Sequence, residues 1–281
     1  MRAPRHSEDP GSSKPSIPKA ATIAGSDSGG CSGIQADLKT FAALGVHGMS
    51  VLTSVTAQNT QRLYTSSDVP LTNIALQMDA VIGDIGVDAA KTGMLSSAAI
   101  VSLVAGKLRD LEVFSLVVDP VMATTGGDSL LDTDALESLR SELLPLALVV
   151  TPNIEEAEIL AGSGITTERE LRKTAERILS MGPRYVLIKG GHRKTDRESI
   201  DCLFDGEEWI ELKAPRIRTE SSRGSGCTLA AAITAFLSRG YSVERAVREA
   251  KEYVTQALRH PLRIGEGPGP LGHFWKWWPN N

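Results

Sequence analysis

The sequence predicts an α/β protein in which helices cover both faces of a mostly parallel central sheet. From residue 20 onward, short apolar runs alternate with segments whose apolar residues recur at helical spacing. This alternation is typical of a parallel sheet with crossover helices on its two faces. Residues 114–119 form a near-continuous apolar run that ends in Asp119, as a strand buried on both faces does. Because no long linker or internal repeat divides the chain, we expect a single domain over residues 19–281.

The first half of the chain has clear helix boundaries. The helix expected over residues 34–44 ends at Gly45, and the helix expected over residues 70–81 begins with Pro70, since proline is favoured at the first helical position. A third helix is expected over residues 98–108. Around these helices, short runs predict strands over residues 20–24, 49–57, 88–92 and 114–119.

The second half continues the alternation and adds a hairpin. Residues 200–204 and 209–213 alternate in polarity around Asp205 and Gly206, which is the strongest hairpin signal in the sequence. We expect irregular segments over residues 124–128 and 265–270, strands over residues 146–150 and 185–189, and helices over residues 133–144, 155–160, 168–181, 229–239 and 243–258.

Composition and charge argue against several classes of partner. The net charge of −4 gives no electrostatic reason to bind nucleic acid or an anionic membrane, and aromatic residues make up only 5% of the chain. No apolar run approaches the ~18 residues that suggest a membrane-spanning helix. We therefore expect small-molecule partners, with no nucleic acid and no membrane.

The cysteines and the N-terminal segment favour a reducing, cytoplasmic setting. Cys31, Cys202 and Cys227 are far apart and odd in number, which fits neither a disulfide framework nor a Cys-x-x-Cys metal site. Residues 1–18 are polar and rich in proline, serine and charge, without the apolar stretch of a signal peptide. We expect these residues to form a disordered extension.

A glycine-rich turn, Gly224-Ser225-Gly226, precedes the helix expected over residues 229–239. The first backbone N–H groups of a helix have no intrahelical partner, the helix dipole makes this end positive, and small residues let an anion approach. Cys227 would lie in the first turn, where the same field favours its thiolate. Taken alone, the turn is equally compatible with a plain helix start in which Cys227 packs as a small hydrophobe.

Polar groups follow several of the expected strands. These groups are Gly25-Ser26-Asp27, Asp119, Asn153 with Glu156, and Lys189. If they converge on the glycine-rich turn, the site holds an anion hole, carboxylates for Mg²⁺ and a lysine for phosphate. Phosphoryl transfer requires this set, because its catalysis is mostly positioning and neutralisation of charge. Singly, each group is also compatible with a solvated loop or a helix cap, and Asn153 and Glu156 have capping-box spacing.

Motifs in a fixed order run from residue 22 to residue 228. They are residues 22–40, Thr56-Ala-Gln-Asn59, Lys91-Thr-Gly-Met-Leu95, Val118-Asp-Pro-Val-Met122, Thr151-Pro-Asn153, Lys189-Gly-Gly-His192 and Gly224-Ser-Gly-Cys-Thr228. Together they resemble the hydroxymethylpyrimidine/phosphomethylpyrimidine kinases of thiamine biosynthesis. The resemblance implies a ribokinase-like three-layer fold, usually a homodimer. It also implies two successive phosphoryl transfers from MgATP, to 4-amino-5-hydroxymethyl-2-methylpyrimidine and then to its monophosphate, which gives the diphosphate.

The resemblance implies a role for each matching residue. The pyrimidine pocket would be lined by Gly25, Asp37, Thr56, Gln58, Met94 and Val121. The catalytic group would be Gly224, Ser225, Gly226, Cys227 and Lys189. Asp119 and Glu156 would organise Mg²⁺, while Asn153, Lys189, Arg223 and Ser225 would bind ATP. An amide such as that of Gln58 suits an aminopyrimidine, because it donates and accepts together.

The sequence departs from the pattern of these kinases at three positions. Arg223 stands where the family often has histidine, and Ser225 stands where it has threonine. Cys31 replaces a glycine in the first motif, for which we have no physical account. Arg223 would add a fixed cation near the phosphates.

Two alternatives remain open from the sequence. A pyridoxal or pyridoxine kinase of the same branch could form a hemithioacetal between its aldehyde substrate and Cys227. A non-catalytic pyrimidine-binding protein on the same fold would need neither Asp119 nor Glu156 for magnesium. Phosphorylated products formed with MgATP separate these possibilities.

Overall fold

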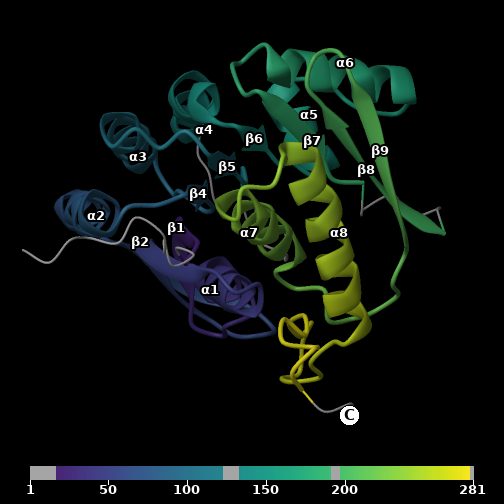
Figure 1. Cartoon of the computed structure of the whole chain (residues 1–281), viewed down its shortest axis with the longest axis horizontal. Helices are drawn as coiled ribbons and strands as arrows, with labels where there is room; N and C mark the ends of the chain where they lie inside the picture. Colours follow the sequence, from purple (N-terminus) through teal and green to yellow (C-terminus); the bar gives the residue numbers. More distant parts are fainter. Residues whose placement is uncertain (1–16, 123–132, 191–196, 279–281) are drawn as a thin grey trace, which may run out of the picture.

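The computed structural model describes residues 17–122, 133–190 and 197–278, and within them nine strands form one continuous sheet (Figure 1). The strands are β1 (Lys19–Asp27), β2 (His47–Gln58), β3 (Leu63–Asp68), β4 (Ala89–Thr92), β5 (Leu116–Val118), β6 (Val149–Val150), β7 (Tyr185–Ile188), β8 (Glu198–Phe204) and β9 (Trp209–Pro215). Strands β2, β1, β4, β5, β6 and β7 lie next to one another in parallel. Antiparallel strands complete both edges, with β3 beside β2, and β8 and β9 beyond β7.

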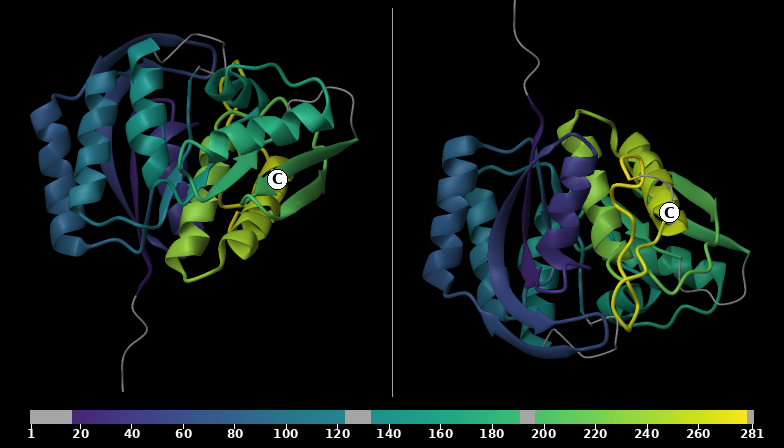
Figure 2. Two further views of the ribbon diagram at one scale, coloured as in Figure 1. Left: turned by 90° about the horizontal axis from the view of Figure 1, so that it is seen from above. Right: turned by 90° about the horizontal axis from the view of Figure 1, so that it is seen from below.

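Helices cover both faces of this sheet. They are α1 (Gly33–Ala43), α2 (Leu71–Met78), α3 (Ala98–Asp110), α4 (Thr133–Ser138), α5 (Ile154–Ala161), α6 (Glu168–Leu179), α7 (Ser225–Ser238) and α8 (Val243–Arg259). Wider π-helical turns continue α2 over Asp79–Ile85 and α4 over Leu139–Leu143, and a 3-10 turn follows over Leu144–Leu146. Figure 2 shows α2 and α3 on one side of β1 and β2, with α1 on the other. The predicted α/β architecture is confirmed.

Strand β5 shows why the buried strands are apolar at every position. Leu116 and Val118 pack in the cluster that contains Val101 of α3, whereas Val117 packs in the cluster that contains Ile233 of α7. Successive side chains of a strand point to opposite faces, and both faces are covered here. The parallel order also brings the carboxyl ends of β1, β4, β5, β6 and β7 to one edge of the sheet.

Some elements differ from the expectation. Strand β3 was not predicted, because its sequence is polar and most of its side chains are exposed. Phe114 is 79% exposed and precedes β5, so that strand is shorter than the apolar run. Strand β6 is reduced to Val149–Val150, since helical turns extend to Leu146.

Some expectations fall on residues that the structure does not describe. The expected loop over residues 124–128 lies outside the described residues, as does all but the end of the expected extension over residues 1–18. The single domain expected over residues 19–281 stays a prediction. Across the described ranges, no helix is both long enough and apolar enough to cross a membrane.

Candidate active site

The carboxyl ends of the parallel strands open into a cavity of about 730 Å³. Residues after β1, β4, β5 and β7 line this cavity, together with the first turn of α7. The lining extends from Gln58 at the end of β2 to Lys251 on α8. Ligands of open α/β sheets bind in the crevice at this edge, and the volume lies within the usual range for ligand pockets.

Three charged side chains meet in this cavity where β5, α5 and β7 come together. Lys189 Nζ lies 2.9 Å from Asp119 Oδ1 and 3.7 Å from Glu156 Oε2. The Thr151 hydroxyl also donates to Asp119 Oδ1, at 3.2 Å. Asp119 follows β5 and Lys189 follows β7, so the parallel order of the sheet places both at one edge. The structure therefore brings the two carboxylates expected at Mg²⁺ together with the lysine expected at phosphate.

The cluster holds opposite charges side by side in a largely dehydrated position. Burial alone would raise the pKa of Asp119, but Lys189 and Lys91 hold it below its usual value. Burial alone would lower the pKa of Lys189, but Asp119 and Glu156 raise it well above its usual range. Burial raises the pKa of Glu156. At neutral pH, Asp119 is therefore ionised and Lys189 carries a positive charge.

Glu156 also caps the beginning of α5. Asn153 Oδ1 accepts a hydrogen bond from the Glu156 N–H at 2.8 Å, and Glu156 Oε2 accepts one from the Asn153 N–H at 2.7 Å. This reciprocal capping box confirms the alternative that the sequence spacing left open. The cap leaves Glu156 close to Asp119, because both carboxylates reach Lys189.

The donor set fits Mg²⁺ only when phosphate supplies further ligands. Within the described ranges, no three His, Cys, Asp or Glu side chains are grouped so that they could hold a metal ion. Mg²⁺ is commonly held by one or two carboxylates plus water and substrate phosphates. Asp119 and Glu156 match that pattern, so a metal ion here would arrive with the nucleotide.

The first turn of α7 presents unpaired backbone amides to the cavity. The helix follows Gly224, whose φ is 81°. A Cβ on Gly224 would lie 2.0 Å from the carbonyl oxygen of Cys31, so the position requires glycine for two reasons. The amides of Gly226 and Cys227 have no backbone partner among the described residues. A Cβ on Gly226 would lie 3.3 Å from Lys189 Nζ, so an anion bound at this helix end would also meet a cation.

The Cys227 thiol lines the same cavity and is protonated at neutral pH. Burial raises the pKa of Cys227 to about 11. Lys91 and the Gly33 N–H act to lower this pKa, whereas Asp119 and Asp37 raise it further. The expectation that the helix end favours the thiolate is therefore wrong, because dehydration and the two carboxylates outweigh the field of α7.

Most of the residues expected to bind the pyrimidine lie in the wall of this cavity. Gly25, Thr56, Gln58, Met94 and Val121 all line it. A Cβ on Gly25 would lie 2.5 Å from Met94 Cε, so the missing side chain makes room for the methionine. The apolar Met94 and Val121 thus face the same space as the amide of Gln58.

Asp37 is the exception, because it lies behind Lys91 rather than in the cavity lining. Both side chains are fully buried, and Lys91 Nζ lies 3.0 Å from Asp37 Oδ2. Thr22 Oγ1 donates to the same oxygen at 2.7 Å. Burial alone would lower the pKa of Lys91, but the Asp37 carboxylate raises it. The position of Asp37 does not support the expected direct contact with substrate, and it is Lys91 that reaches the cavity.

Lys91 lies in one of the sequence motifs, but no role for its side chain was expected. One signal could have found it: Lys91 is the charged residue of the otherwise uncharged strand β4. A lysine in the middle of a buried parallel strand needs a carboxylate partner, because an unpaired buried charge is too costly.

A second buried ion pair was also missed, at the α8 end of the cavity. Lys251 Nζ lies 2.7 Å from Asp201 Oδ2, and Asp201 Oδ1 accepts a hydrogen bond from the Gly190 N–H at 2.9 Å. A Cβ on Gly190 would lie 1.8 Å from the carbonyl oxygen of Ile200, so β8 passes directly against this glycine. The pair therefore fixes α8 and β8 next to the residue that follows Lys189.

The residues expected to bind ATP lie in two directions. Asn153, Lys189 and Ser225 line the cavity beside the α7 turn. Arg223 lines the cavity too, but its guanidinium donates to Gln58 Oε1 at 2.8 Å and to the carbonyl oxygen of Thr60 at 3.2 Å. The expected contact between Arg223 and the phosphates is not supported by this position, because its guanidinium is directed to the end of β2.

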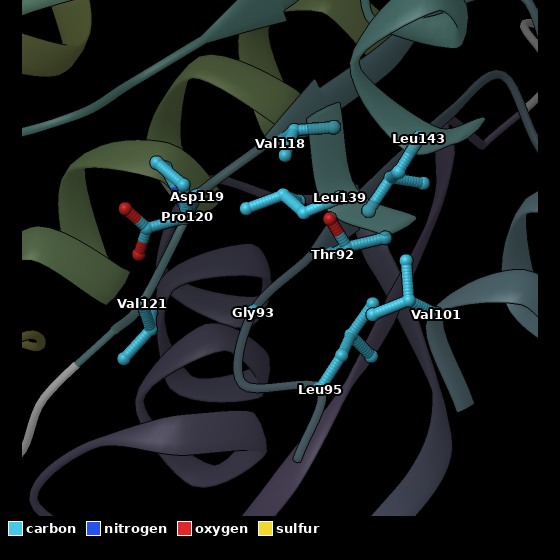
Figure 3. Close-up of a pocket in the computed structure, with 10 residues that line it drawn as sticks. All are labelled: Thr92, Gly93, Leu95, Val101, Val118, Asp119, Pro120, Val121, Leu139 and Leu143. Atoms are coloured by element: carbon cyan, nitrogen blue, oxygen red, sulfur yellow. The ribbon is translucent and has the colours of Figure 1, made fainter. Parts of the chain in front are cut away.

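A narrow gap of about 10 Å³ lies behind Asp119. Figure 3 shows Val101, Leu139 and Leu143 around Thr92, while the Asp119 carboxylate points away from them. Thr92 Oγ1 is buried and has no hydrogen-bond partner among the residues described. The gap has room for about one water molecule and is too small for a substrate.

Comparison with known proteins identifies a family that matches most of the chain. The family described as phosphomethylpyrimidine kinase matches residues 27–272. The chain belongs to this phosphomethylpyrimidine kinase family. A family member, the hydroxymethylpyrimidine/phosphomethylpyrimidine kinase of Streptomyces coelicolor, is 50% identical over 258 residues, which cover 92% of this chain and 95% of that protein.

Solved structures share the fold of this phosphomethylpyrimidine kinase family member. The ADP complex of Bacillus subtilis pyridoxal kinase is similar with a TM-score of 0.86 and 38% identity, covering 92% of this chain and 98% of that chain. The phosphomethylpyrimidine kinase of Clostridium difficile 630 is similar with a TM-score of 0.77 and 41% identity, covering 86% of this chain and 100% of that chain. The expected ribokinase-like fold is confirmed.

Proposed function

We propose that the protein phosphorylates 4-amino-5-hydroxymethyl-2-methylpyrimidine with ATP, and then phosphorylates the monophosphate to the diphosphate, in thiamine biosynthesis. One observation carries this function: a single cavity holds free α7 amides, the Lys189–Asp119–Glu156 cluster and the Gln58 amide. The kinase name of the relative that is 50% identical supports the same substrates. Phosphoryl transfer needs an anion hole, a cation and a site for the acceptor within one pocket.

The α7 turn would hold the transferring phosphoryl group. Among the described residues the Gly226 and Cys227 amides have no backbone partner and can bind its oxygens, and the positive end of the helix dipole stabilises their negative charge. Lys189 would neutralise charge on the same group, since it lies beside Gly226. Asp119 and Glu156 would hold Mg²⁺, which supplies neutralisation of phosphate charge when it is bound with ATP.

Cys227 would accept the proton of the acceptor alcohol in its thiolate form, after its own proton has left to solvent. Its thiol has a pKa of about 11, so the thiolate is scarce before substrate binds. A loose phosphoryl-transfer transition state needs little activation of the attacking oxygen. A small fraction of thiolate is therefore sufficient, and the buried Lys91 ammonium would stabilise it. Accepting the alcohol proton then returns Cys227 to the thiol.

A pyridoxal kinase activity is the second candidate. The 38% identity to Bacillus subtilis pyridoxal kinase and the half-buried Cys227 thiol in the cavity wall, which could add to an aldehyde, favour it. An assay decides between the two: the protein, MgATP, the pyrimidine alcohol, its monophosphate and pyridoxal are combined, and the products are separated by mass. We expect the pyrimidine monophosphate and diphosphate. Pyridoxal phosphate as the main product would support the second candidate, and no product would support a binding protein.

We also propose a cytoplasmic homodimer. Elements at one edge of the sheet carry exposed apolar side chains, with exposures of 49% for Val55 on β2, 55% for Tyr64 on β3 and 65% for Leu76 on α2. Burying these exposed apolar side chains against a second copy of the chain would favour such a dimer. Sedimentation velocity of the purified protein measures the mass, and a monomer at micromolar concentration would argue against the dimer.

A further inference from the structure

The side chain of Arg223 is held from several directions. Nη2 donates to Gln58 Oε1 at 2.8 Å, and Nη1 donates to the carbonyl oxygen of Thr60 at 3.2 Å. The Arg223 N–H donates to the carbonyl oxygen of Gly269 at 3.3 Å, and Arg223 itself is only 8% exposed. The Gly267 N–H in turn donates to Thr60 Oγ1 at 3.1 Å. The segment that contains Gly267 and Gly269 thus holds both Arg223 and Thr60, so the guanidinium has a fixed position.

This contact decides which way the amide of Gln58 points. A guanidinium carries only donors, so Gln58 must turn its oxygen, never its nitrogen, toward Arg223. The main chain of Gln58 is fixed as well, because Ser28 Oγ donates to its carbonyl at 2.8 Å and accepts from its N–H at 2.9 Å. No described residue accepts a hydrogen bond from Gln58 Nε2. Gln58 lines the cavity, so this amide nitrogen is available to a ligand.

We propose, building on the proposed function, that Arg223 is a positioning residue that locks Gln58 as a hydrogen-bond donor to a ring nitrogen of the bound pyrimidine. The bound ligand is a nitrogen heteroaromatic ring with an acceptor atom at the edge that faces Gln58. Without Arg223, the Gln58 amide could rotate and present either its nitrogen or its oxygen to the ligand. Binding would then have to fix one orientation, which weakens the affinity. Arg223 therefore acts on ring recognition and not on the phosphates.

The arrangement also joins ring recognition to the anion-binding turn. Arg223 immediately precedes Gly224 in the chain, and the left-handed conformation of Gly224 starts α7. The same residue therefore contacts Gln58 with its side chain and leads into the turn with its backbone. Because the guanidinium does not point to the turn amides, losing it should weaken substrate binding more than it slows the transfer step.

The test uses the full-length protein at pH 8 and calorimetric dissociation constants for hydroxymethylpyrimidine and for a non-hydrolysable ATP analogue. Gln58→Glu is the decisive variant, because it keeps the acceptor for Arg223 but removes the donor. Gln61→Glu is the matched control, since it makes the same change on the exposed side chain of the adjoining loop. Two pyridine analogues of the substrate, each with one ring nitrogen replaced by CH, identify the atom that is contacted.

We expect Gln58→Glu to weaken pyrimidine binding by about 10- to 100-fold, the range for leaving a buried polar group unpaired. Binding of the ATP analogue and the melting temperature should not change, and Gln61→Glu should bind like the wild type. One pyridine analogue should bind the wild type about 10- to 100-fold more weakly than hydroxymethylpyrimidine does. The same analogue and hydroxymethylpyrimidine should bind Gln58→Glu with equal affinity. Arg223→Met should raise KM for the pyrimidine about 5- to 10-fold with little change in kcat, and Arg223→Lys should restore part of the loss.

Wild-type affinity of Gln58→Glu for the pyrimidine would overturn the donor assignment while leaving the proposed function intact. A fall in kcat at unchanged KM for Arg223→Met would overturn the positioning role. If the wild type binds no pyrimidine but binds pyridoxal, the proposed function fails, and the same variants are measured with pyridoxal. Weaker binding of pyridoxal to Gln58→Glu would then support the donor assignment, because that ring also carries acceptor atoms, and unchanged binding would overturn it.

Discussion

Removing the ammonium of Lys91 is the most informative perturbation of this protein. Lys91 Nζ and Asp37 Oδ2 lie 3.0 Å apart, and both side chains are 0% exposed. In Lys91→Met, the Asp37 carboxylate stays buried without its cation, which costs about 3–5 kcal/mol of unfolding free energy. For a domain of this size, that loss corresponds to a melting temperature lower by about 6–20 °C, at about 2–4 °C per kcal/mol.

Two further variants separate folding from catalysis. In Lys91→Met with Asp37→Leu, neither charge of this pair is left buried, so most of the lost stability should return. Activity should stay low, because Lys91 opposes the rise in the pKa of Cys227 and supplies the buried positive charge of the cavity wall. Lys107→Met is the matched control: Lys107 pairs with Asp79 at 2.7 Å, but the side chains are 25% and 47% exposed, so we expect a loss of about 1 kcal/mol or less.

Urea denaturation followed by circular dichroism measures the unfolding free energies, and coupled ADP release measures turnover at saturating MgATP. If Lys91→Met unfolds within about 1 kcal/mol of the wild type, the pair is not the buried ion pair described above. If the double variant turns over at the wild-type rate, Lys91 contributes to folding alone. The combination we expect is a stable double variant with impaired turnover.

The remaining predictions concern Cys227 and the α7 turn. Cys227→Ala should slow single-turnover phosphorylation by about 10²–10⁴-fold while nucleotide binding is retained, and a wild-type rate would mean that Cys227 is not the proton acceptor. With a pKa of about 11, alkylation of Cys227 by iodoacetamide should rise about tenfold per pH unit from pH 7 to 10, as measured by peptide mass spectrometry; a plateau below pH 9 would contradict the burial argument. Gly224→Ala should abolish tight nucleotide binding, because its Cβ would meet Cys31 at 2.0 Å. The control Gly240→Ala has the same φ of 81° with nothing within 4 Å and should bind normally.

The sheet and its edge could be predicted because their signals are local. The apolar positions of β5 already indicate a strand covered on both faces, and Asp119 and Lys189 follow strands whose carboxyl ends meet. The hairpin around Gly206 was also visible in the sequence and forms between β8 and β9. Strand β3 had no such signal, because its polar side chains are exposed and only its pairing with β2 makes it a strand.

The candidate site was predictable in its members but not in their partners. The turn at Gly224 and the carboxylates of Asp119 and Glu156 stand out by residue type and by position after strands. Arg223 was expected at the phosphates, yet it binds Gln58, which lies 165 residues away in the chain. Residue type alone could not indicate that direction, since a long flexible cation reaches whichever acceptor the packing presents.

By itself, the sequence determined the alternation of strands and helices, the sheet edge that carries the polar groups and the glycine turn that starts α7. These features follow from periodicity and from residue types with few allowed conformations, so they need no knowledge of distant contacts. Tertiary structure decided the rest: it buries Asp37 behind Lys91, 54 residues away, and it turns Arg223 to Gln58. It also keeps the Cys227 thiol protonated. Burial and the partners of a charge depend on which segments pack together, and dehydration at Cys227 is stronger than the helix field that the local sequence supplies.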